Sequence, residues 1–245
     1  MQTDKVALVT GGSRGIGRAV AERLGATGMS VVVNYRSDRE AAEDVTARIQ
    51  DLGGKAVAVH ADVTEPASLR GLFDAADEHF GGLDMLVNNV GITRFSAFVD
   101  TPDDDYNLLF DTNTRATFTA LREAARRLRD SGRIVVMSSI VTAVSPSDTG
   151  VYGATRAAVD HFVRVLAKEL GPRGITVNSV APGPVNTEAM AAARFTPGVQ
   201  DVAAQIPPLG RMAEPADIAD IVAFLAGDDS RWISGQTIYA NGGAF

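Results

Sequence analysis

The stretch Val6-Ala7-Leu8-Val9-Thr10-Gly11-Gly12-Ser13-Arg14-Gly15-Ile16-Gly17 decides the fold of this chain. Its apolar start predicts a buried parallel strand, and the glycines predict a tight turn into a helix. Glycines let the backbone approach a pyrophosphate closely, and the free N–H groups of a helix N-terminus attract anions. The spacing G-x-x-x-G-x-G differs from G-x-G-x-x-G, but its place between a strand and an amphipathic helix indicates a nucleotide-binding turn. The expected nucleotide contacts are Gly11, Ser13, Arg14, Gly15, Ile16 and Gly17.

Beyond this turn, short apolar runs alternate with helix-length segments along the whole chain. The expected strands are Lys5–Thr10, Ser30–Tyr35, Lys55–His60, Leu83–Asn88, Gly132–Ser138, Gly174–Val180 and Gln236–Ala240. The expected helices are Gly15–Thr27, Glu40–Leu52, Pro66–Phe80, Pro102–Arg129, Gly150–Leu170 and Pro215–Gly227. Such alternation implies right-handed crossovers between parallel strands.

The sequence therefore predicts an α/β fold class, a single-domain Rossmann fold over residues 1–245. We expect a doubly wound, mostly parallel sheet of about seven strands with helices on both faces. Residues 185–212 contain three prolines and no clear strand or long helix. A segment of this length in a compact domain is typically functional, so we expect a substrate loop there.

Composition narrows the class of protein further. Among 245 residues, 23 Lys and Arg face 30 Asp and Glu, which gives a formal net charge of −7. This acidity argues against a nucleic-acid partner and against a polybasic membrane anchor. The absence of Cys excludes disulfides and thiolate chemistry, and the three His show no metal-ligand spacing. With no leader-like start and no run of about 18 apolar residues, we expect a cytoplasmic protein without a metal.

The end of the second strand indicates which cofactor the turn holds. It reads Asn34-Tyr35-Arg36-Ser37, four residues expected to contact the cofactor. An NAD-binding protein places a carboxylate here for the ribose 2′-hydroxyl, and this chain has none. Arg36 and Arg14 are two cations that can clamp a 2′-phosphate, although both could also be ordinary solvated arginines. We expect NADP(H), with NAD(H) as the alternative.

Further motifs follow in a fixed order: Asp62-Val63, Asn88-Asn89-Val90-Gly91, Asn113, Ser139, Tyr152 and Pro182-Gly183. With this order, and with Ser139 and Tyr152 at 13 residues' separation, nearly the whole chain resembles the short-chain dehydrogenase/reductase family. Within that family it resembles 3-oxoacyl-(acyl-carrier-protein) reductases most, in residues 91–94, 173–178 and 241–243. The resemblance implies hydride transfer between a nicotinamide and a carbonyl or secondary alcohol.

The resemblance also implies roles for individual residues. Tyr152 would be the acid/base, Ser139 would bind the substrate oxygen, and Asn113 would kink its helix and support a proton relay. The remaining implied cofactor contacts are Asp62, Val63, Asn89, Val90, Gly91, Tyr152, Arg156, Pro182, Gly183, Val185 and Thr187.

The chain departs from the family at one catalytic position. The family has Lys four residues after the Tyr, on the same helix face, whereas this chain has Arg156. An arginine can still favour tyrosinate and can donate to the nicotinamide ribose, but it does not release a proton near neutral pH. Two readings follow: an active enzyme with Arg156 as its catalytic cation, or an NADP(H)-binding protein with weak or no turnover.

We expect a reductase of a 3-oxoacyl or related secondary-metabolite ketone, or the reverse reaction. A sugar or steroid dehydrogenase is the rival within the class, because residues 185–212 and Thr93–Phe98, which would set the substrate, cannot be decoded from composition. The substrate would be a small molecule, with a carrier-protein-bound form as one option. Arg129 and Arg173 are the basic residues that could hold an acidic carrier.

The resemblance also implies a homotetramer, with a dimer as the alternative. One interface would be formed by Pro102–Arg129 and Gly150–Leu170, and the other by Pro215–Gly227 with the C-terminal strand. The apolar residues near the C-terminus, from Ile238 to Phe245, would be costly to leave in water.

Overall fold

The computed structural model describes residues 5–188, 190 and 207–245. Its centre is a seven-stranded sheet in the order β3-β2-β1-β4-β5-β6-β7, and every pair of neighbours is parallel. The strands are β1 (Val6–Val9), β2 (Ser30–Tyr35), β3 (Lys55–His60), β4 (Leu83–Asn88), β5 (Leu128–Met137), β6 (Thr176–Pro182) and β7 (Thr237–Ala240). The strand order reverses between β1 and β4, so the predicted doubly wound Rossmann fold is confirmed.

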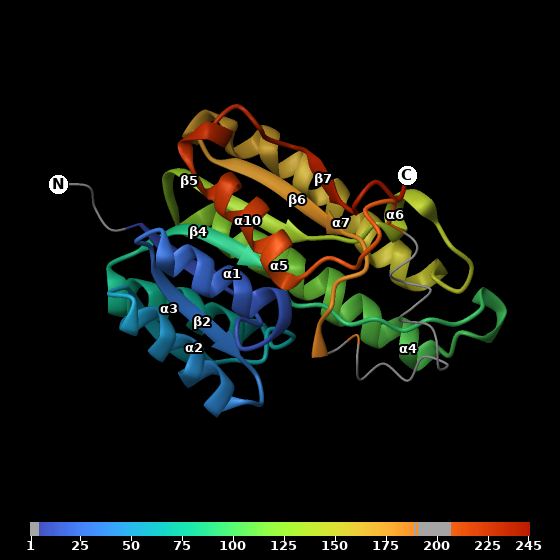
Figure 1. The fold of residues 1–245 in the computed structure, drawn as a ribbon, viewed down its shortest axis with the longest axis horizontal. Helices are drawn as coiled ribbons and strands as arrows, with labels where there is room; N and C mark the ends of the chain where they lie inside the picture. Colours follow the sequence, from blue (N-terminus) through green and yellow to red (C-terminus); the bar gives the residue numbers. More distant parts are fainter. Residues whose placement is uncertain (1–4, 189, 191–206) are drawn as a thin grey trace.

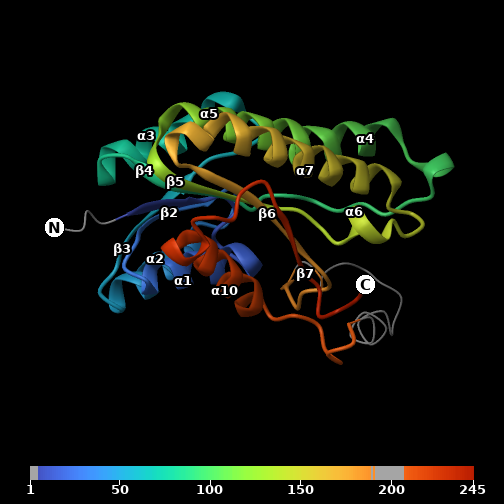
Figure 2. The same ribbon diagram turned by 90° about the horizontal axis from the view of Figure 1, so that it is seen from above.

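Helices cover both faces of the sheet, as Figures 1 and 2 show. One face carries α1 (Gly15–Ala26), α2 (Arg39–Asp51) and α10 (Pro215–Ala226). The other carries α3 (Pro66–Phe80), α4 (Asp103–Leu109), α5 (Ala116–Arg127) and α7 (Gly150–Leu170). The short helix α6 (Val141–Val144) follows β5, and single turns occupy Phe98–Asp100, Gly171–Arg173 and Asp228–Ser230.

The two layers explain why the strands are apolar almost throughout. Along β1, Val6 and Leu8 belong to the core under α3, α5 and α7, whereas Ala7 and Val9 belong to the core under α1, α2 and α10. Successive strand side chains point to opposite faces, so a strand covered on both sides has no polar face. All four residues of β1 are buried.

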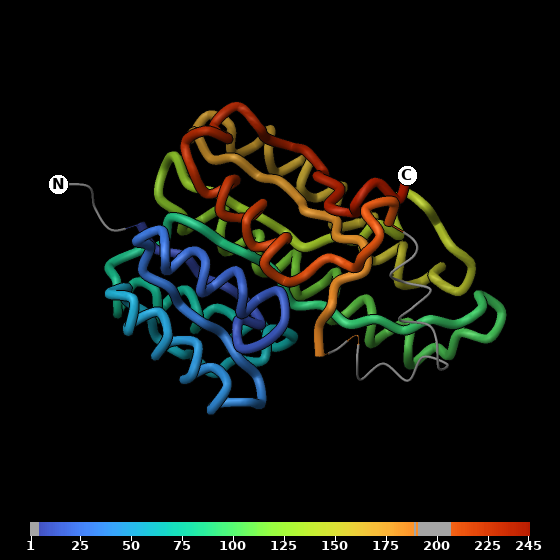
Figure 3. The backbone as a smooth tube through the Cα atoms, viewed as in Figure 1, coloured from blue at the N-terminus to red at the C-terminus, as the bar shows by residue number. Residues whose placement is uncertain are grey.

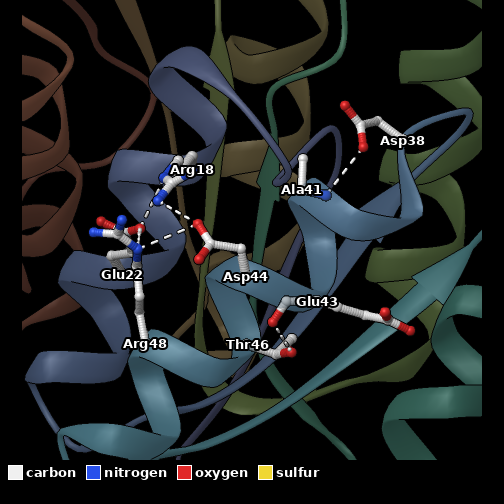
Figure 4. A network of polar contacts seen from close by, with 8 residues as sticks. All are labelled: Arg18, Glu22, Asp38, Ala41, Glu43, Asp44, Thr46 and Arg48. Carbon is white, nitrogen blue, oxygen red and sulfur yellow. Dashed lines mark hydrogen bonds and ion pairs between the residues drawn. The ribbon is translucent and has the colours of Figure 1, made fainter.

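An ion-pair network joins α1 to α2 on the surface (Figure 4). Arg18 of α1 donates to Glu22 at 2.9 Å and to Asp44 of α2 at 2.7 Å, and Arg48 approaches Asp44 at 3.2 Å. These hydrogen bonds and charges lower the pKa of Asp44, the one from Arg18 most strongly. Each exposed ion pair contributes little to the free energy of folding. We therefore infer that the network helps to orient α1 and α2, whose apolar faces already pack in the core.

The predicted long helix Pro102–Arg129 is interrupted in the structure. Between α4 and α5, residues Phe110–Arg115 form a π-helical turn. A π turn inserts an extra residue into the helical hydrogen-bond pattern, and such turns often lie at functional sites. The next strand also begins earlier than predicted, because Leu128 already pairs with Leu83 before a bulge that includes Ser131 at a positive φ of 63°.

Two loops extend past the carboxyl edge of the sheet, after β4 and after β5 (Figure 3). They run together, because the N–H of Ser96 donates to the carbonyl of Asp148 at 2.9 Å. In an open α/β sheet, ligands bind outside the carboxyl ends of the strands. This edge is therefore where the site residues should meet.

Candidate active site

The glycine turn between β1 and α1 is shaped by two requirements of its backbone. Gly11 and Gly15 adopt positive φ values of 61° and 53°, which L side chains rarely adopt. A Cβ on Gly17 would lie 2.1 Å from the carbonyl oxygen of Gly11, so only glycine lets α1 pack this closely on the turn. Arg14, at the N-cap of α1, gives the first turn no side-chain hydrogen bond. The N–H groups of that turn are therefore available to an anion.

Two asparagines, Asn34, which is buried, and Asn89, which is partly buried, form hydrogen bonds with the backbone of the turn. Asn34 accepts from the N–H of Gly11 at 3.0 Å and donates to the carbonyl of Ala61 at 3.0 Å. Asn89 donates to the carbonyl of Thr10 at 3.1 Å, and its own N–H donates to the Thr10 hydroxyl at 2.9 Å. Through these hydrogen bonds, Asn34 and Asn89 hold the glycine turn in place against β2, β3 and β4.

The two candidate phosphate-binding arginines stand exposed at the edge of this turn. Neither Arg14 nor Arg36 has a carboxylate within ion-pair distance among the described residues, whereas Arg18 and Arg39 both do. Near Arg36, Tyr35 contacts the ring of His60 at 5.5 Å, and Ser37 is exposed. Two exposed arginines that form no ion pair within the described residues suit a site for a phosphate group.

Asp62 and Val63 follow β3 beside this edge. The pKa of Asp62 is lowered, first by the hydroxyl of Thr64, which donates to it at 2.7 Å, and also by the Thr64 N–H and the charge of Arg36. Asp62 therefore stays ionised and turned toward its own loop. The side chain of Val63 lies in the core, so Val63 offers a ligand only its backbone.

Ser139 and Tyr152 come to the carboxyl edge from two different elements. Ser139 lies two residues after the end of β5, and Tyr152 lies in the first turn of α7; both are buried, at 9% and 8% exposure. The ring of Phe95, from the loop after β4, meets the Tyr152 ring edge-on at 6.0 Å. The Tyr152 ring thus has an aromatic neighbour from the loop after β4.

Arg156 lies one helical turn beyond Tyr152 and is only 5% exposed. Its guanidinium carbon is 5.5 Å from the centre of the Tyr152 ring, and its Nη1 donates to the carbonyl of Met137 at 3.0 Å. Among the described residues, its buried Nε has no hydrogen-bond partner and its guanidinium has no carboxylate within ion-pair distance. The predicted cation therefore stands beside the predicted acid.

Asn113 lies in the π turn and connects three parts of the site. Its side chain accepts from the N–H of Ile92 at 2.8 Å and donates to the carbonyl of the same residue at 2.9 Å. It also donates to the hydroxyl of Thr155 at 3.1 Å, which in turn donates to the carbonyl of Tyr152 at 2.7 Å. These hydrogen bonds join the π turn to the loop after β4 and to α7.

Comparison with known proteins now places the chain. A family model described as Enoyl-(Acyl carrier protein) reductase matches residues 11–244. Versicolorin reductase of Emericella nidulans is 43% identical over 252 residues, which cover 98% of this chain and 96% of that protein. A short chain dehydrogenase from Burkholderia cenocepacia in complex with NADP has a TM-score of 0.92 at 40% identity, covering 99% and 98% of the two chains. The chain belongs to the short-chain dehydrogenase/reductase family.

A second solved structure is similar to this chain over almost its whole length. The angucycline C-6 ketoreductase LanV with bound NADP has a TM-score of 0.93 at 39% identity, covering 99% of this chain and 96% of LanV. The single-domain architecture is therefore that of the short-chain dehydrogenase/reductase family, and the protein is an oxidoreductase.

In this short-chain dehydrogenase/reductase, the segment after β6 also lies at the carboxyl edge of the sheet. The carbonyl of Pro182 accepts from the N–H of Ile140, and the N–H of Gly183 donates to the carbonyl of Ala240. Val185 is buried and bridges to Ala213. A Cβ on Gly15 would lie 3.4 Å from Thr187, so the glycine turn and the segment after β6 approach each other. Of the expected substrate loop 185–212, residues 189 and 191–206 lie outside the described residues.

Two residues proposed for carrier binding lie elsewhere. Arg129 stands near the start of β5, not its carboxyl end, and binds Asp84 at 2.8 Å and the carbonyl of Gly81 at 2.6 Å. Arg173 precedes β6, pairs with Asp130 at 2.8 Å and also donates to the carbonyls of Ala125 and Leu128. Both guanidinium groups are engaged within the protein, at the edge of the sheet opposite the site.

Sequence reasoning missed two supporting residues, Thr155 and Thr10. Thr155 is fully buried and links Asn113 to Tyr152, and Thr10 links the glycine turn to Asn89. The sequence offered one signal for them: each is a hydroxyl residue within or next to a motif, Thr155 between Tyr152 and Arg156 and Thr10 before Gly11. Within the described part of the chain, no helix is both long and apolar enough for a membrane span, and no group of acidic or His residues could hold a metal ion.

Proposed function

We propose that this short-chain dehydrogenase/reductase uses NADP(H) to reduce a ketone to a secondary alcohol, or to catalyse the reverse reaction. The observation that carries the proposal is the buried Tyr152, with the Arg156 guanidinium 5.5 Å from its ring. Arg14 and Arg36, which form no ion pair with a described carboxylate, favour NADP(H) over NAD(H). LanV and the Burkholderia cenocepacia protein, both solved with NADP, support this choice of cofactor.

Each residue of the site has a role in this reaction. Bound NADPH supplies the hydride. Tyr152 donates its phenolic proton to the substrate oxygen as the alkoxide forms, and the Ser139 hydroxyl donates a hydrogen bond to the same oxygen. Arg156 places a permanent positive charge beside Tyr152, which favours the tyrosinate left after proton transfer. Asn113 and Thr155 position Tyr152 by holding the backbone of α7.

We further propose that the ketone belongs to a fused-ring aromatic molecule. The relatives that support this class include versicolorin reductase and a hydroxynaphthalene reductase-like protein of Metarhizium brunneum, and LanV has also been solved with rabelomycin. The ring of Phe95, half exposed beside Tyr152, is a suitable surface for a flat aromatic substrate. A carrier-bound 3-oxoacyl group remains the second candidate, without support from Arg129 or Arg173.

A substrate panel tests these proposals. NADPH and NADH oxidation would be followed with a bicyclic aromatic ketone, a 3-oxoacyl thioester, a steroid ketone and a keto sugar. The proposal expects the highest kcat/KM with NADPH and the aromatic ketone. Turnover with the thioester alone would replace the substrate class. Tight NADPH binding without turnover of any ketone would instead favour the non-catalytic reading, which none of the named reductase relatives supports.

We also propose a homotetramer, on the basis of apolar side chains exposed along α5 and α7. Phe118 is 47% exposed and Val165 is 42% exposed, and Phe118 packs against Phe162 at 6.1 Å. Exposed apolar groups gathered on neighbouring helices favour burial against another subunit. Light scattering at micromolar concentration should give four times the chain mass; a twofold mass would favour the dimer, and a monomer would refute the proposal.

A further inference from the structure

The loop after β4 contains a compact turn, residues 96–101, which we call the 96–101 turn. The N–H of Asp100 donates to the carbonyl of Ala97 at 3.0 Å, and the hydroxyl of Thr101 donates to the same carbonyl at 3.1 Å. The hydroxyls of Ser96 and Thr101 lie 2.6 Å apart and share a hydrogen bond. The turn is therefore held together by its own polar groups.

The ring of Phe98 attaches this turn to the start of α7. Phe98 is 79% exposed, yet a Cβ built on Gly150 would lie 2.8 Å from its Cδ2 and 3.5 Å from its Cε2. The ring therefore lies directly over Gly150, in space that a side chain at position 150 would fill. The N–H of Ser96 donates to the carbonyl of Asp148 at 2.9 Å and makes a second contact between the same two segments.

The backbone of Gly150 does not itself require glycine. Gly150 is not among the described glycines with a positive φ, and it lies in the first turn of α7, where alanine is a better helix former. Alanine at this position would suit the helix, but its methyl group would displace the ring of Phe98. This substitution therefore separates the seat of Phe98 from the stability of α7.

The 96–101 turn continues directly from Phe95, the aromatic neighbour of Tyr152. Phe95 immediately precedes Ser96, and its ring meets the Tyr152 ring edge-on at 6.0 Å while remaining 49% exposed. Because the two segments are continuous, a shift of the turn moves the backbone of Phe95 and reorients its ring. A side chain that is already held in its binding geometry loses less conformational freedom when a ligand binds.

We propose that Phe98 is a positioning residue for the substrate: its ring, seated on Gly150, holds the 96–101 turn on α7 and so keeps Phe95 in place against Tyr152. This inference rests on the proposed function, because it takes the half-exposed ring of Phe95 as the surface that binds an aromatic ketone. Phe98 itself needs no contact with the substrate. Its loss should weaken the binding of a flat aromatic ketone and leave proton transfer from Tyr152 unchanged.

Steady-state kinetics with NADPH test the proposal in the unmodified enzyme, Phe98→Ala, Gly150→Ala and the double variant. We expect each single substitution to raise KM for a bicyclic aromatic ketone by roughly three- to tenfold, with kcat and the NADPH dissociation constant within about twofold of the original. A small aliphatic ketone, which gains little from an aromatic ring, should show a much smaller rise. The double variant should have the KM of Phe98→Ala, because no ring is left for the methyl group to displace.

Val99 provides a matched control, since it is the next residue of the same turn and is 90% exposed. Val99→Ala should leave KM unchanged for both ketones. An unchanged KM in Phe98→Ala would overturn the proposal. Effects of the two substitutions that multiply in the double variant would overturn the seat on Gly150, and equal rises for the aromatic and aliphatic ketones would overturn the role of Phe95.

Amide hydrogen exchange keeps this test separate from the proposed function. The N–H of Ser96 is held by the carbonyl of Asp148, so a loosened turn exchanges this hydrogen faster. We expect roughly five- to tenfold faster exchange at Ser96 in Phe98→Ala and Gly150→Ala, and no change in Val99→Ala. If the unmodified protein reduces no aromatic ketone while Ser96 shows these changes, the proposed function fails and the anchoring by Phe98 stands. Unchanged exchange at Ser96 in Phe98→Ala overturns the anchoring, whichever ketone is reduced.

Discussion

The nucleotide turn and the catalytic pocket treat their buried polar atoms in opposite ways. In the turn, both polar side-chain atoms of Asn34 pair with backbone groups, and Nδ2 of Asn89 donates to the carbonyl of Thr10. Beside Tyr152, Nε of Arg156 is buried without a partner among the described residues, as are the hydroxyl of Ser138 and, nearer the amino end of β5, Nε of Arg133. Because Nε of Arg133 is also unpaired, an unpaired atom does not by itself mark a ligand site; the two regions differ in that the side chain of Asn34 is paired within the protein and Nε of Arg156 is not. We therefore expect mutations of the residues that brace the turn to lower the free energy of unfolding, and mutations around Tyr152 to lower kcat.

Tyr152→Phe should have the largest effect, a loss of turnover with little change in cofactor binding. The phenylalanine ring can keep its packing against Phe95 but has no proton to donate, so kcat should fall by roughly 10²–10⁴-fold. The NADPH dissociation constant should stay within a few-fold of the original, as measured by fluorescence titration. Unchanged turnover would remove Tyr152 from the mechanism, and lost NADPH binding would mean that pocket and turn are not independent.

Arg36→Asp should reverse the choice of cofactor at the outer edge of the turn. The substitution removes a cation and places a carboxylate where a ribose 2′-hydroxyl can be bound, so the ratio of NADH to NADPH affinity should rise by roughly ten- to a hundredfold. Calorimetric titration with both reduced cofactors measures the ratio. Arg70→Asp on α3, an exposed residue with the same change of charge, is the control and should leave the ratio unchanged.

Asn34→Leu should reveal the bracing of the turn as a loss of stability. The leucine leaves the N–H of Gly11 and the carbonyl of Ala61 unpaired inside the protein, which costs about 1–3 kcal/mol in the free energy of unfolding. Urea denaturation measures it, with the exposed Asn107→Leu of α4 as the control. A variant as stable as the original would show that the turn does not depend on this brace.

Thr64→Val should have the smallest effect, and one that depends on pH. Thr64 is the first cause of the lowered pKa of Asp62, so its loss should raise that pKa toward the ordinary value. A lowered pKa in the folded protein stabilises the fold above the unfolded-state pKa, and this contribution is lost as the pH falls through the folded value. The variant should therefore lose stability near neutral pH but not in strong acid. A carboxyl NMR titration checks the shift, and an equal loss at every pH would contradict it.

Much of the fold was predictable because its signals are local. The sequence predicted β2, β3 and β4 with their observed ends, because each is an apolar run bounded by turn residues. The π turn at Asn113 was hidden inside a helical pattern, because an extra residue in a helix does not change which residues are apolar. The early start of β5 was missed for a similar reason: the polar residues Arg129, Asp130 and Ser131 separate Leu128 from the apolar run, and only the pairing of Leu128 with Leu83 of β4 adds it to the strand.

The sequence alone identified the candidate site residues and the order in which the chain supplies them. It also revealed that a cation stands one helical turn from Tyr152, since helical spacing is a local property. Only the tertiary structure decided where that cation points. Arg156 donates to the carbonyl of Met137 at the end of β5, and its guanidinium occupies space beside Gly91 after β4. Both neighbours therefore come from strand ends and not from α7. A long side chain takes its direction from neighbours that are distant along the chain, which no spacing within α7 encodes.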